Sequence, residues 1–164
     1  MMIFGFAGWS GSGKTTLIEQ LIPRFVQRGL SVSLIKHAHH RFDIDHPGKD
    51  SWRHRQAGCK EVLVSSDTRW VVMHELRGEP EPPLDEQIKR ISPCDLLLIE
   101  GYKRYPMPKL EIWRRENAKP LLHPQDEHIV AIAADSGVET RLPRFDLNDY
   151  DAIGDFVLSY NGLK

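Results

Sequence analysis

The feature that most constrains the fold is a phosphate-binding loop near the start of the chain. Residues 8–15 read Gly-Trp-Ser-Gly-Ser-Gly-Lys-Thr and match the pattern G-x-x-x-x-G-K-[ST] at every fixed position. An apolar run at residues 3–7 precedes the loop, and an amphipathic run at residues 17–26 follows it. Because this strand–loop–helix order is the context that the pattern requires, we predict that the chain binds a nucleoside di- or triphosphate.

The residue types of the loop predict how the phosphates are held. The glycines Gly8, Gly11 and Gly13 keep side chains away, so backbone N–H groups can turn inward on an anion. The helix expected to start near Lys14 directs the positive end of its dipole to the same place. Lys14 is predicted to contact the β- and γ-phosphates, and the Thr15 hydroxyl to ligate Mg²⁺.

Composition limits the remaining possibilities. The chain has 164 residues, 40% of them apolar, which suits one domain spanning residues 1–164. A net charge of −1 gives no overall field towards nucleic acid or an anionic membrane, so neither is expected as a partner. No apolar run approaches the ~20 residues of a membrane span. Because the first expected strand starts at residue 3, we expect no signal peptide. Two isolated cysteines suit a reducing compartment, and we expect a cytoplasmic protein.

Hydrophobic periodicity predicts alternating strands and helices, so the fold class is α/β. We expect a mostly parallel sheet of the P-loop NTPase type, flanked by helices and carrying extra inserted strands. Pro23 should bend the first helix, while Asp50 or Ser51 should cap the second and Asn148 the last. The expected strands span residues 3–7, 31–37, 61–64, 69–76, 95–100, 109–114 and 128–134, and the expected helices 14–29, 51–58, 84–91 and 148–161.

Two carboxylates, Asp95 and Glu100, bracket one strongly apolar strand, and roughly 16 Å of extended chain separates them. Only one can therefore lie near a metal ion at the phosphates. Ligands of open α/β sheets bind beyond the carboxyl ends of the strands. We therefore assign Glu100 to Mg²⁺ and Asp95 to a structural role at the start of the strand.

A dense polar segment begins where the second strand is expected to end. Zinc binding by His37 and His39 is one interpretation, although no cysteine supports it and the spacing fits no structural zinc pattern. The second is a loop that contacts substrate, a partner or magnesium, with Asp50 as a further carboxylate near the metal ion or a water molecule. A solvated loop without function is the third. The candidate residues are Lys36, His37, His39, His40, Lys49 and Asp50.

The motifs together resemble those of the MobB family, from about residue 3 to residue 156. A phosphate loop is shared by many enzymes, whereas the lysine–histidine segment followed by Pro-Gly-Lys-Asp-Ser is much more specific. The matching segments are residues 7–17, 34–40, 45–51, 98–103 and 129–135.

The resemblance implies a P-loop fold that forms a homodimer and binds GTP with Mg²⁺. It further implies weak GTP hydrolysis and assistance to the MobA enzyme, which joins GMP to molybdopterin; the molybdopterin cofactor itself is a possible ligand. Carried over, residues 11–16, including Ser12 and Thr16, hold phosphates, and Thr15 and Glu100 hold Mg²⁺. Lys14, Glu100 and Asp50 are then the catalytic candidates.

Two departures from related P-loop proteins are visible. Trp9 stands where wider relatives often carry a lysine that reaches across a dimer, which excludes activation by that lysine. No Asn-Lys-x-Asp segment exists for reading guanine. Asp135, at the carboxyl end of the strand at 128–134, can accept hydrogen bonds from guanine N1 and N2, or it can be an ordinary turn residue before Ser136-Gly137.

Three functions remain open on the sequence alone. The first is a GTP-binding accessory protein with slow hydrolysis, since no glutamine is obviously placed to orient water and an arginine from a partner is unknown. The second is an ATP-dependent small-molecule kinase with Arg114 and Arg115 as a phosphate lid. The third is a non-catalytic adaptor. The strands at 69–76 and 109–114 are candidates for dimer pairing, since exposed edge strands tend to be covered.

Overall fold

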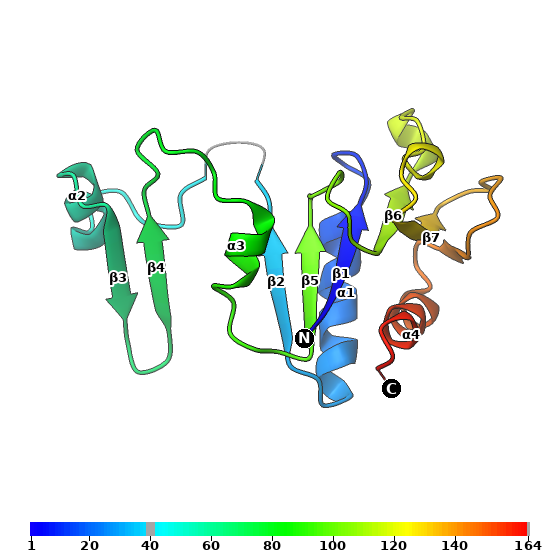
Figure 1. Cartoon of the computed structure of the whole chain (residues 1–164), viewed down its shortest axis with the longest axis horizontal. Coiled ribbons are helices and arrows are strands. Elements are labelled where there is room, and N and C mark those ends of the chain that lie inside the picture. The colour runs from blue at the N-terminus through cyan, green and yellow to red at the C-terminus, as the bar shows by residue number, and fades with distance from the viewer. Residues whose placement is uncertain (39–41, 164) are drawn as a thin grey trace. The chain divides into compact units, whose positions relative to one another are not determined.

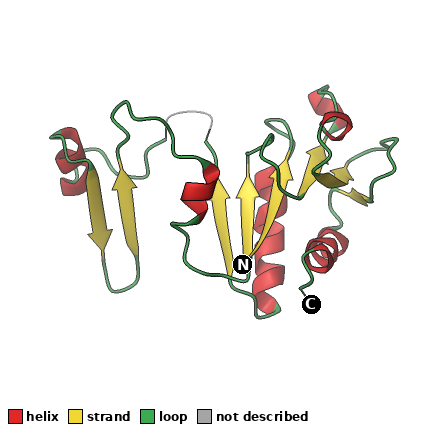
Figure 2. Ribbon diagram, in the orientation of Figure 1, coloured by secondary structure: helices red, strands yellow, loops and turns green. Residues whose placement is uncertain are grey.

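The alternation of strands and helices is present in the computed structural model, which describes residues 1–38 and 42–163 (Figures 1 and 2). Short 3₁₀ turns lie at Arg115–Asn117 and His123–Gln125. In chain order the elements are β1 (Met2–Ala7), α1 (Lys14–Gln27), β2 (Val32–Lys36), α2 (Asp50–Gln56), β3 (Glu61–Ser65), β4 (Trp70–His74), α3 (Leu84–Ile88), β5 (Leu96–Glu100), β6 (Lys109–Trp113), β7 (Ile129–Ala134), β8 (Arg144–Asp146) and α4 (Tyr150–Tyr160).

The chain divides into two compact units. Residues 1–37 and 91–164 form the first unit, and residues 38–90 form the second. The second unit is inserted between β2 and β5, which are hydrogen-bonded neighbours in the sheet of the first unit.

A six-stranded parallel sheet is the centre of the first unit, with strand order β2-β5-β1-β6-β7-β8. Each neighbouring pair is parallel, so the carboxyl ends share one edge, at the arrowheads of β2, β5 and β1 in Figure 1. Because β1 lies between β5 and β6, the loop that follows it emerges near the middle of this edge. The predicted mostly parallel α/β fold is confirmed.

One face of the sheet is covered by α1 and α4. Alternate residues of the strands, such as Phe4 and Leu98, point to this face and are fully buried. Leu21 of α1 and Ile153 of α4 are also 0% exposed and belong to the same cluster. This packing holds the start of α1, and with it the phosphate loop, against the sheet.

The opposite face of β6 carries two charged side chains that are completely buried. Glu111 is 0% exposed, and its carboxylate accepts hydrogen bonds from the backbone N–H groups of Leu122 and His123, at 2.6 and 3.0 Å. Lys109 is 1% exposed and donates to Asp126 Oδ2 at 2.6 Å. Buried charges persist only when they are paired in this way, so β6 fixes the loop between itself and β7.

β6 also corrects one prediction. Residues 109–114 were expected to be an inserted strand available for dimer pairing, but β6 is hydrogen-bonded to β1 on one side and to β7 on the other. Its backbone groups are therefore already used in hydrogen bonds to these two strands.

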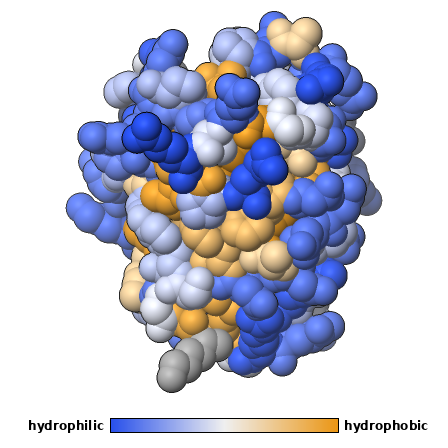
Figure 3. All heavy atoms as spheres, turned by 90° about the vertical axis from the view of Figure 1, so that its right-hand side faces the viewer, coloured by the Kyte–Doolittle hydropathy of each residue, from blue (hydrophilic) through white to orange (hydrophobic). Residues whose placement is uncertain are grey.

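One edge of the sheet is β8, a strand of three residues, and a short edge strand offers little for another chain to pair with. Figure 3 views this side of the molecule and shows apolar residues surrounded by hydrophilic ones.

In the second unit, β3 and β4 form the predicted hairpin as a separate antiparallel sheet. Leu63 pairs directly with Val72, and Ser65 with Trp70, so these side chains share one face. Leu63, Trp70 and Val72 are 61%, 66% and 43% exposed. The hairpin thus presents an apolar face to its surroundings.

Three predictions about the helices need correction or qualification. Asp149, not Asn148, caps α4, because its side chain accepts from the Ala152 N–H. The residue before α2 is Lys49, which makes no side-chain cap bond. α1 continues through Pro23. Among the described residues no helix combines the length and apolar character that crossing a membrane requires.

Candidate functional site

The phosphate loop leaves the carboxyl end of β1 and runs into α1. Gly11 and Gly13 have φ values of 79° and 93°, which favour glycine, and Gly13 is the residue before α1. A Cβ atom at Gly8 would lie 2.5 Å from the Ile112 carbonyl oxygen and 2.6 Å from Ser12 Oγ. The loop therefore passes its neighbours too closely for a side chain at Gly8, whereas at Gly11 and Gly13 the backbone conformation itself favours glycine.

Lys14 lies within the curve of this loop. Its ammonium group donates to the carbonyl oxygens of Gly8 and Trp9, at 3.0 and 2.9 Å. Burial lowers the pKa of Lys14 below its ordinary value, although the nearby Glu100 carboxylate acts in the opposite direction. A partly buried cation beside a ring of backbone amides is a suitable environment for phosphate oxygens.

Thr15 and Glu100 meet at the first turn of α1, as predicted. The Thr15 hydroxyl donates to Glu100 Oε1 at 2.9 Å, although the two residues lie on different elements. Glu100 is the last residue of β5 and is only 5% exposed. Hydroxyl and carboxylate oxygens are ligands that Mg²⁺ takes at phosphate sites, together with waters and the phosphates themselves.

Asp95 lies at the other end of β5. Its carboxylate accepts from the Ser31 N–H at 2.8 Å and from the Ser31 hydroxyl at 2.6 Å. The Ser31 hydroxyl and then its N–H hold the pKa of Asp95 below its usual range. Asp95 therefore joins the loop before β2 to the start of β5, and its predicted structural role is confirmed.

Lys36, which ends β2, is brought next to the Thr15–Glu100 pair. The register of β2 and β5 places Lys36 beside Glu100. Its ammonium nitrogen lies 3.1 Å from Thr15 Oγ1 and 3.3 Å from Glu100 Oε2. The next residue, His37, donates its backbone N–H to the Glu100 carbonyl oxygen at 2.9 Å, and its ring packs 5.0 Å from that of Tyr102.

Trp9 is held in place by two groups that are distant from it in the sequence and that no local pattern indicates. Its indole N–H donates to the Pro120 carbonyl oxygen at 2.8 Å. The Lys103 ammonium lies 4.3 Å from the centre of the Trp9 ring, a cation–π contact. Burial lowers the pKa of Lys103, whose charge in turn lowers the pKa of Lys14. Lys103 thus adds positive charge beside the loop.

Arg114 follows β6 and also contacts the phosphate loop. Its Nε donates to the Ser12 carbonyl oxygen at 3.1 Å, and a Cβ at Gly13 would lie 3.2 Å from its Nη2. In the folded chain this side chain braces the loop backbone. Arg114 and Ser12 are 102 positions apart in the sequence, so local patterns do not indicate this contact and predicted Arg114 only as part of a kinase lid.

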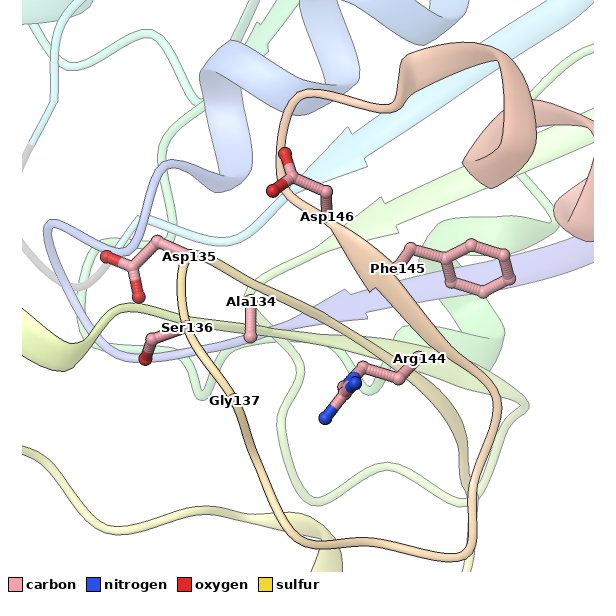
Figure 4. Close-up of a pocket in the computed structure, with 7 residues that line it drawn as sticks. All are labelled: Ala134, Asp135, Ser136, Gly137, Arg144, Phe145 and Asp146. Carbon is pink, nitrogen blue, oxygen red and sulfur yellow. The ribbon is translucent and has the colours of Figure 1, made fainter.

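Asp135 lies at the carboxyl end of β7, where a small cavity opens. One carboxylate oxygen accepts from the Arg115 N–H at 3.0 Å. Figure 4 shows that Asp135 and Ser136 come from the end of β7, while Arg144 and Asp146 come from β8. The cavity has a volume of about 350 Å³ and is lined by Ala134, Asp135, Ser136, Gly137, Arg144, Phe145 and Asp146.

In the second unit, the polar segment is organised around Arg55. Its guanidinium, 8% exposed, contacts Asp43 at 2.8 Å, Asp45 at 3.2 Å and Glu75 at 2.6 Å. Its hydrogen bonds to Asp43 and Glu75, followed by one to Asp45, raise the pKa of Arg55. The Ser51 hydroxyl donates to Asp45, so Ser51 stabilises this cluster instead of capping α2.

Apart from Asp135 at the end of β7, the predicted site residues thus fall into three groups. Lys14, Thr15, Lys36 and Glu100 come together at the carboxyl edge of the sheet, with Gly8, Gly11, Ser12, Gly13, Thr16 and His37 around them. Lys49 and Asp50 belong to the second unit, and their role at the phosphates stays a prediction. His39 and His40 lie outside the described residues.

The known proteins that are similar to more than 80% of this chain agree with one another. The family model of "Molybdopterin guanine dinucleotide synthesis protein B" (MobB) matches residues 3–135. A "Molybdopterin-guanine dinucleotide biosynthesis adapter protein" of Haemophilus influenzae is 42% identical over 94% of this chain and 86% of its own. A protein of the same name from Escherichia coli is 38% identical over 96% of this chain and 92% of its own length.

Solved structures agree. The crystal structure of Bacillus subtilis MobB superimposes with a TM-score of 0.78 at 28% identity, over 100% of this chain and 99% of that one. The similarity therefore extends over both units of the chain.

Proposed function

This chain belongs to the MobB family, and on that premise we propose that it is a GTP-binding adapter in the synthesis of molybdopterin guanine dinucleotide. In this proposal it binds GTP with Mg²⁺, hydrolyses it slowly, and assists a MobA-type guanylyltransferase in the cytoplasm. The observation that carries the proposal is the phosphate loop whose Thr15 is hydrogen-bonded to the buried Glu100. The names of the Haemophilus influenzae and Escherichia coli relatives supply the adapter role.

Thr15 and Glu100 are the residues that would hold Mg²⁺. Their oxygens fit the ion's preference, and a cationic group, the Lys36 ammonium, already lies against both of them. Among the described residues no three His, Cys, Asp or Glu side chains gather as a metal site. When bound with the nucleotide, Mg²⁺ would be held by Thr15 and Glu100 and would supply charge stabilisation to the triphosphate.

We propose that Asp135, at the end of β7, recognises the guanine base. One strand, β6, separates β1 from β7, so about 10 Å separates the phosphate loop from Asp135 along the sheet edge. A ribose and base can span such a distance, and the cavity of about 350 Å³ beside Asp135 is of the size of a small-ligand site. A carboxylate accepts from both guanine N1 and N2, which adenine cannot match.

Slow hydrolysis is expected because the chain supplies few catalytic groups. Lys14 would stabilise charge on the phosphates and Glu100 would hold the metal ion, while Asp50 is the candidate to position water. Arg114 donates to the Ser12 carbonyl oxygen and is therefore not free to stabilise the γ-phosphate. An arginine supplied by a partner can raise the rate of GTP hydrolysis by about 10³–10⁵. Without that help we expect GTP turnover to be slow.

Calorimetric titration with GTP and with ATP, each with Mg²⁺, tests nucleotide binding and base choice. The wild type should bind GTP more tightly than ATP, and Lys14→Ala should lose most of the affinity for both. Asp135→Asn should lose the preference for GTP and keep affinity for ATP. No binding of either nucleotide would overturn the proposal, and transfer of the γ-phosphate to a small acceptor would favour the kinase alternative.

Reconstitution with a MobA-type enzyme tests the adapter role. We expect guanylyltransfer to molybdopterin to increase on adding the wild type and to increase less with Lys14→Ala. An equal response to both would show that assistance does not depend on the nucleotide. Lys36, His37, His39, His40, Lys49 and Asp50 are the proposed contacts to the partner or to the cofactor.

A further inference from the structure

The position of Lys36 has a consequence for metal binding. Its ammonium nitrogen lies 3.1 Å from Thr15 Oγ1 and 3.3 Å from Glu100 Oε2, oxygens of the two residues that are proposed to hold Mg²⁺. The Thr15 proton is directed to Glu100 Oε1, so the Thr15 lone pairs are left to accept from Lys36. Lys36 therefore uses the electron pairs that a metal ion would need.

A metal ion and this ammonium cannot share the position. Mg²⁺ binds its oxygen ligands at about 2.0–2.1 Å, so an ion on the same lone pairs would lie far inside the contact distance of the Lys36 nitrogen. Both groups are positively charged and would repel strongly at that separation. Binding of one at Thr15 and Glu100 requires the other to leave.

The buried charge of Glu100 is the reason that Lys36 lies beside Thr15 and Glu100. The side chain of Glu100 is buried, and a buried charge without a partner is costly. The ammonium of Lys14, which also interacts electrostatically with Glu100, is engaged with the carbonyl oxygens of Gly8 and Trp9. Lys36, with a side chain 51% exposed, can reach Glu100 and can also move away into solvent. It neutralises the carboxylate without being fixed to it.

We propose that Lys36 is an internal competitor of the divalent cation, and that the metal ion displaces it efficiently only when a nucleoside triphosphate arrives with it. The triphosphate supplies further ligands to the metal ion and negative charge for the displaced ammonium. Metal binding is thereby coupled to nucleotide binding. This inference rests on the proposed function, because it assumes that the loop binds a triphosphate.

Titration of nucleotide-free protein with Mn²⁺, followed by electron paramagnetic resonance, tests the competition. Lys36→Met removes the ammonium and keeps most of the stem, so Mn²⁺ should bind about tenfold more tightly than to the wild type. Lys36→Arg keeps the charge and should bind Mn²⁺ as weakly as the wild type. Lys89→Met removes one exposed lysine outside the site and controls for net charge. Equal Mn²⁺ affinity in Lys36→Met and the wild type would overturn the proposal.

Nitrogen-15 NMR of the lysine ammonium groups provides a second test on the wild type itself. Mg²⁺ alone, at concentrations that saturate the site with nucleotide, should leave the Lys36 signal unchanged, and Mg²⁺ with GTP should shift it. A Lys36 signal that stays unchanged while Mg²⁺ and GTP bind would refute the inference and leave the proposed function intact. Failure of GTP to bind would instead refute the proposed function.

Discussion

At the scale of single residues, the packing around Gly8 leaves no room for a side chain without movement of the backbone. A methyl group there would lie 2.5 Å from a backbone carbonyl oxygen on β6, which cannot move aside as the end of a flexible side chain can. We expect Gly8→Ala to lower the free energy of unfolding by about 1–3 kcal/mol and to weaken GTP binding. Urea unfolding and calorimetry measure the two effects.

The matched control is Gly137→Ala, where an added Cβ meets no heavy atom within 4 Å. Its free energy of unfolding should stay close to that of the wild type. Equal stability of Gly8→Ala and the wild type would contradict the close packing of the loop on β6.

Asp95 predicts a pH dependence of stability at the residue scale. Because the hydrogen bonds from Ser31 lower the pKa of Asp95, its contribution is fully present above the ordinary carboxyl pKa and is lost as the pH falls through the lowered value. Urea unfolding should therefore find Asp95→Asn less stable than the wild type at neutral pH, with the difference shrinking in acid.

Glu127→Gln removes an exposed carboxylate and serves as the comparison for Asp95. Glu127→Gln should change the free energy of unfolding little, both at neutral pH and in acid. A difference between Asp95→Asn and the wild type that grows in acid would contradict the assignment.

At the scale of elements, α1 and α4 pack through Gly154. A Cβ there would lie 3.6 Å from Leu21 and 3.6 Å from Phe25, which is ordinary van der Waals contact. Alanine also restricts the unfolded chain more than glycine does. We expect Gly154→Ala to raise the free energy of unfolding by about 0.5–1 kcal/mol, measured by urea denaturation.

Gly162→Ala provides the contrast, because Gly162 has a φ of 68° just after α4 and a methyl group is strained there. That variant should be destabilised. A loss of stability in Gly154→Ala would mean that α4 approaches α1 more closely than the distances indicate.

At the scale of the whole molecule, we propose that the apolar face of the β3–β4 hairpin is the contact of the homodimer that the family resemblance implies. A two-stranded sheet is rarely stable alone in water, and large apolar side chains on one face favour association. We expect Leu63→Lys to shift sedimentation velocity profiles from dimer towards monomer at micromolar concentration.

Thr68→Lys adds the same charge at the exposed hairpin turn, outside this face, and should leave the association unchanged. A wild-type protein that sediments as a monomer would contradict the dimer, and a dimer retained in Leu63→Lys would place the contact elsewhere.

The sequence alone determined the class of fold, the place of the glycine-rich loop between β1 and α1, and which charged end of β5 lies beside that loop: Glu100 contacts Thr15, whereas Asp95 contacts Ser31. These predictions of position succeeded because they rest on local patterns: glycine spacing, apolar runs, and the end of a strand at which a charge lies. The buried strand at 95–100 and the hairpin at 61–76 were predicted for the same reason.

Only the tertiary structure decided which distant side chains meet. The charged residues Lys109 and Glu111 made β6 resemble an exposed strand, yet partners brought in by the loop after it allow both to be buried. Lys36 and Thr15 are 21 positions apart in the sequence, and Thr15 and Glu100 are 85 positions apart, yet each pair of side chains is in contact. Such contacts depend on the order of strands in the sheet, which hydrophobic periodicity does not encode.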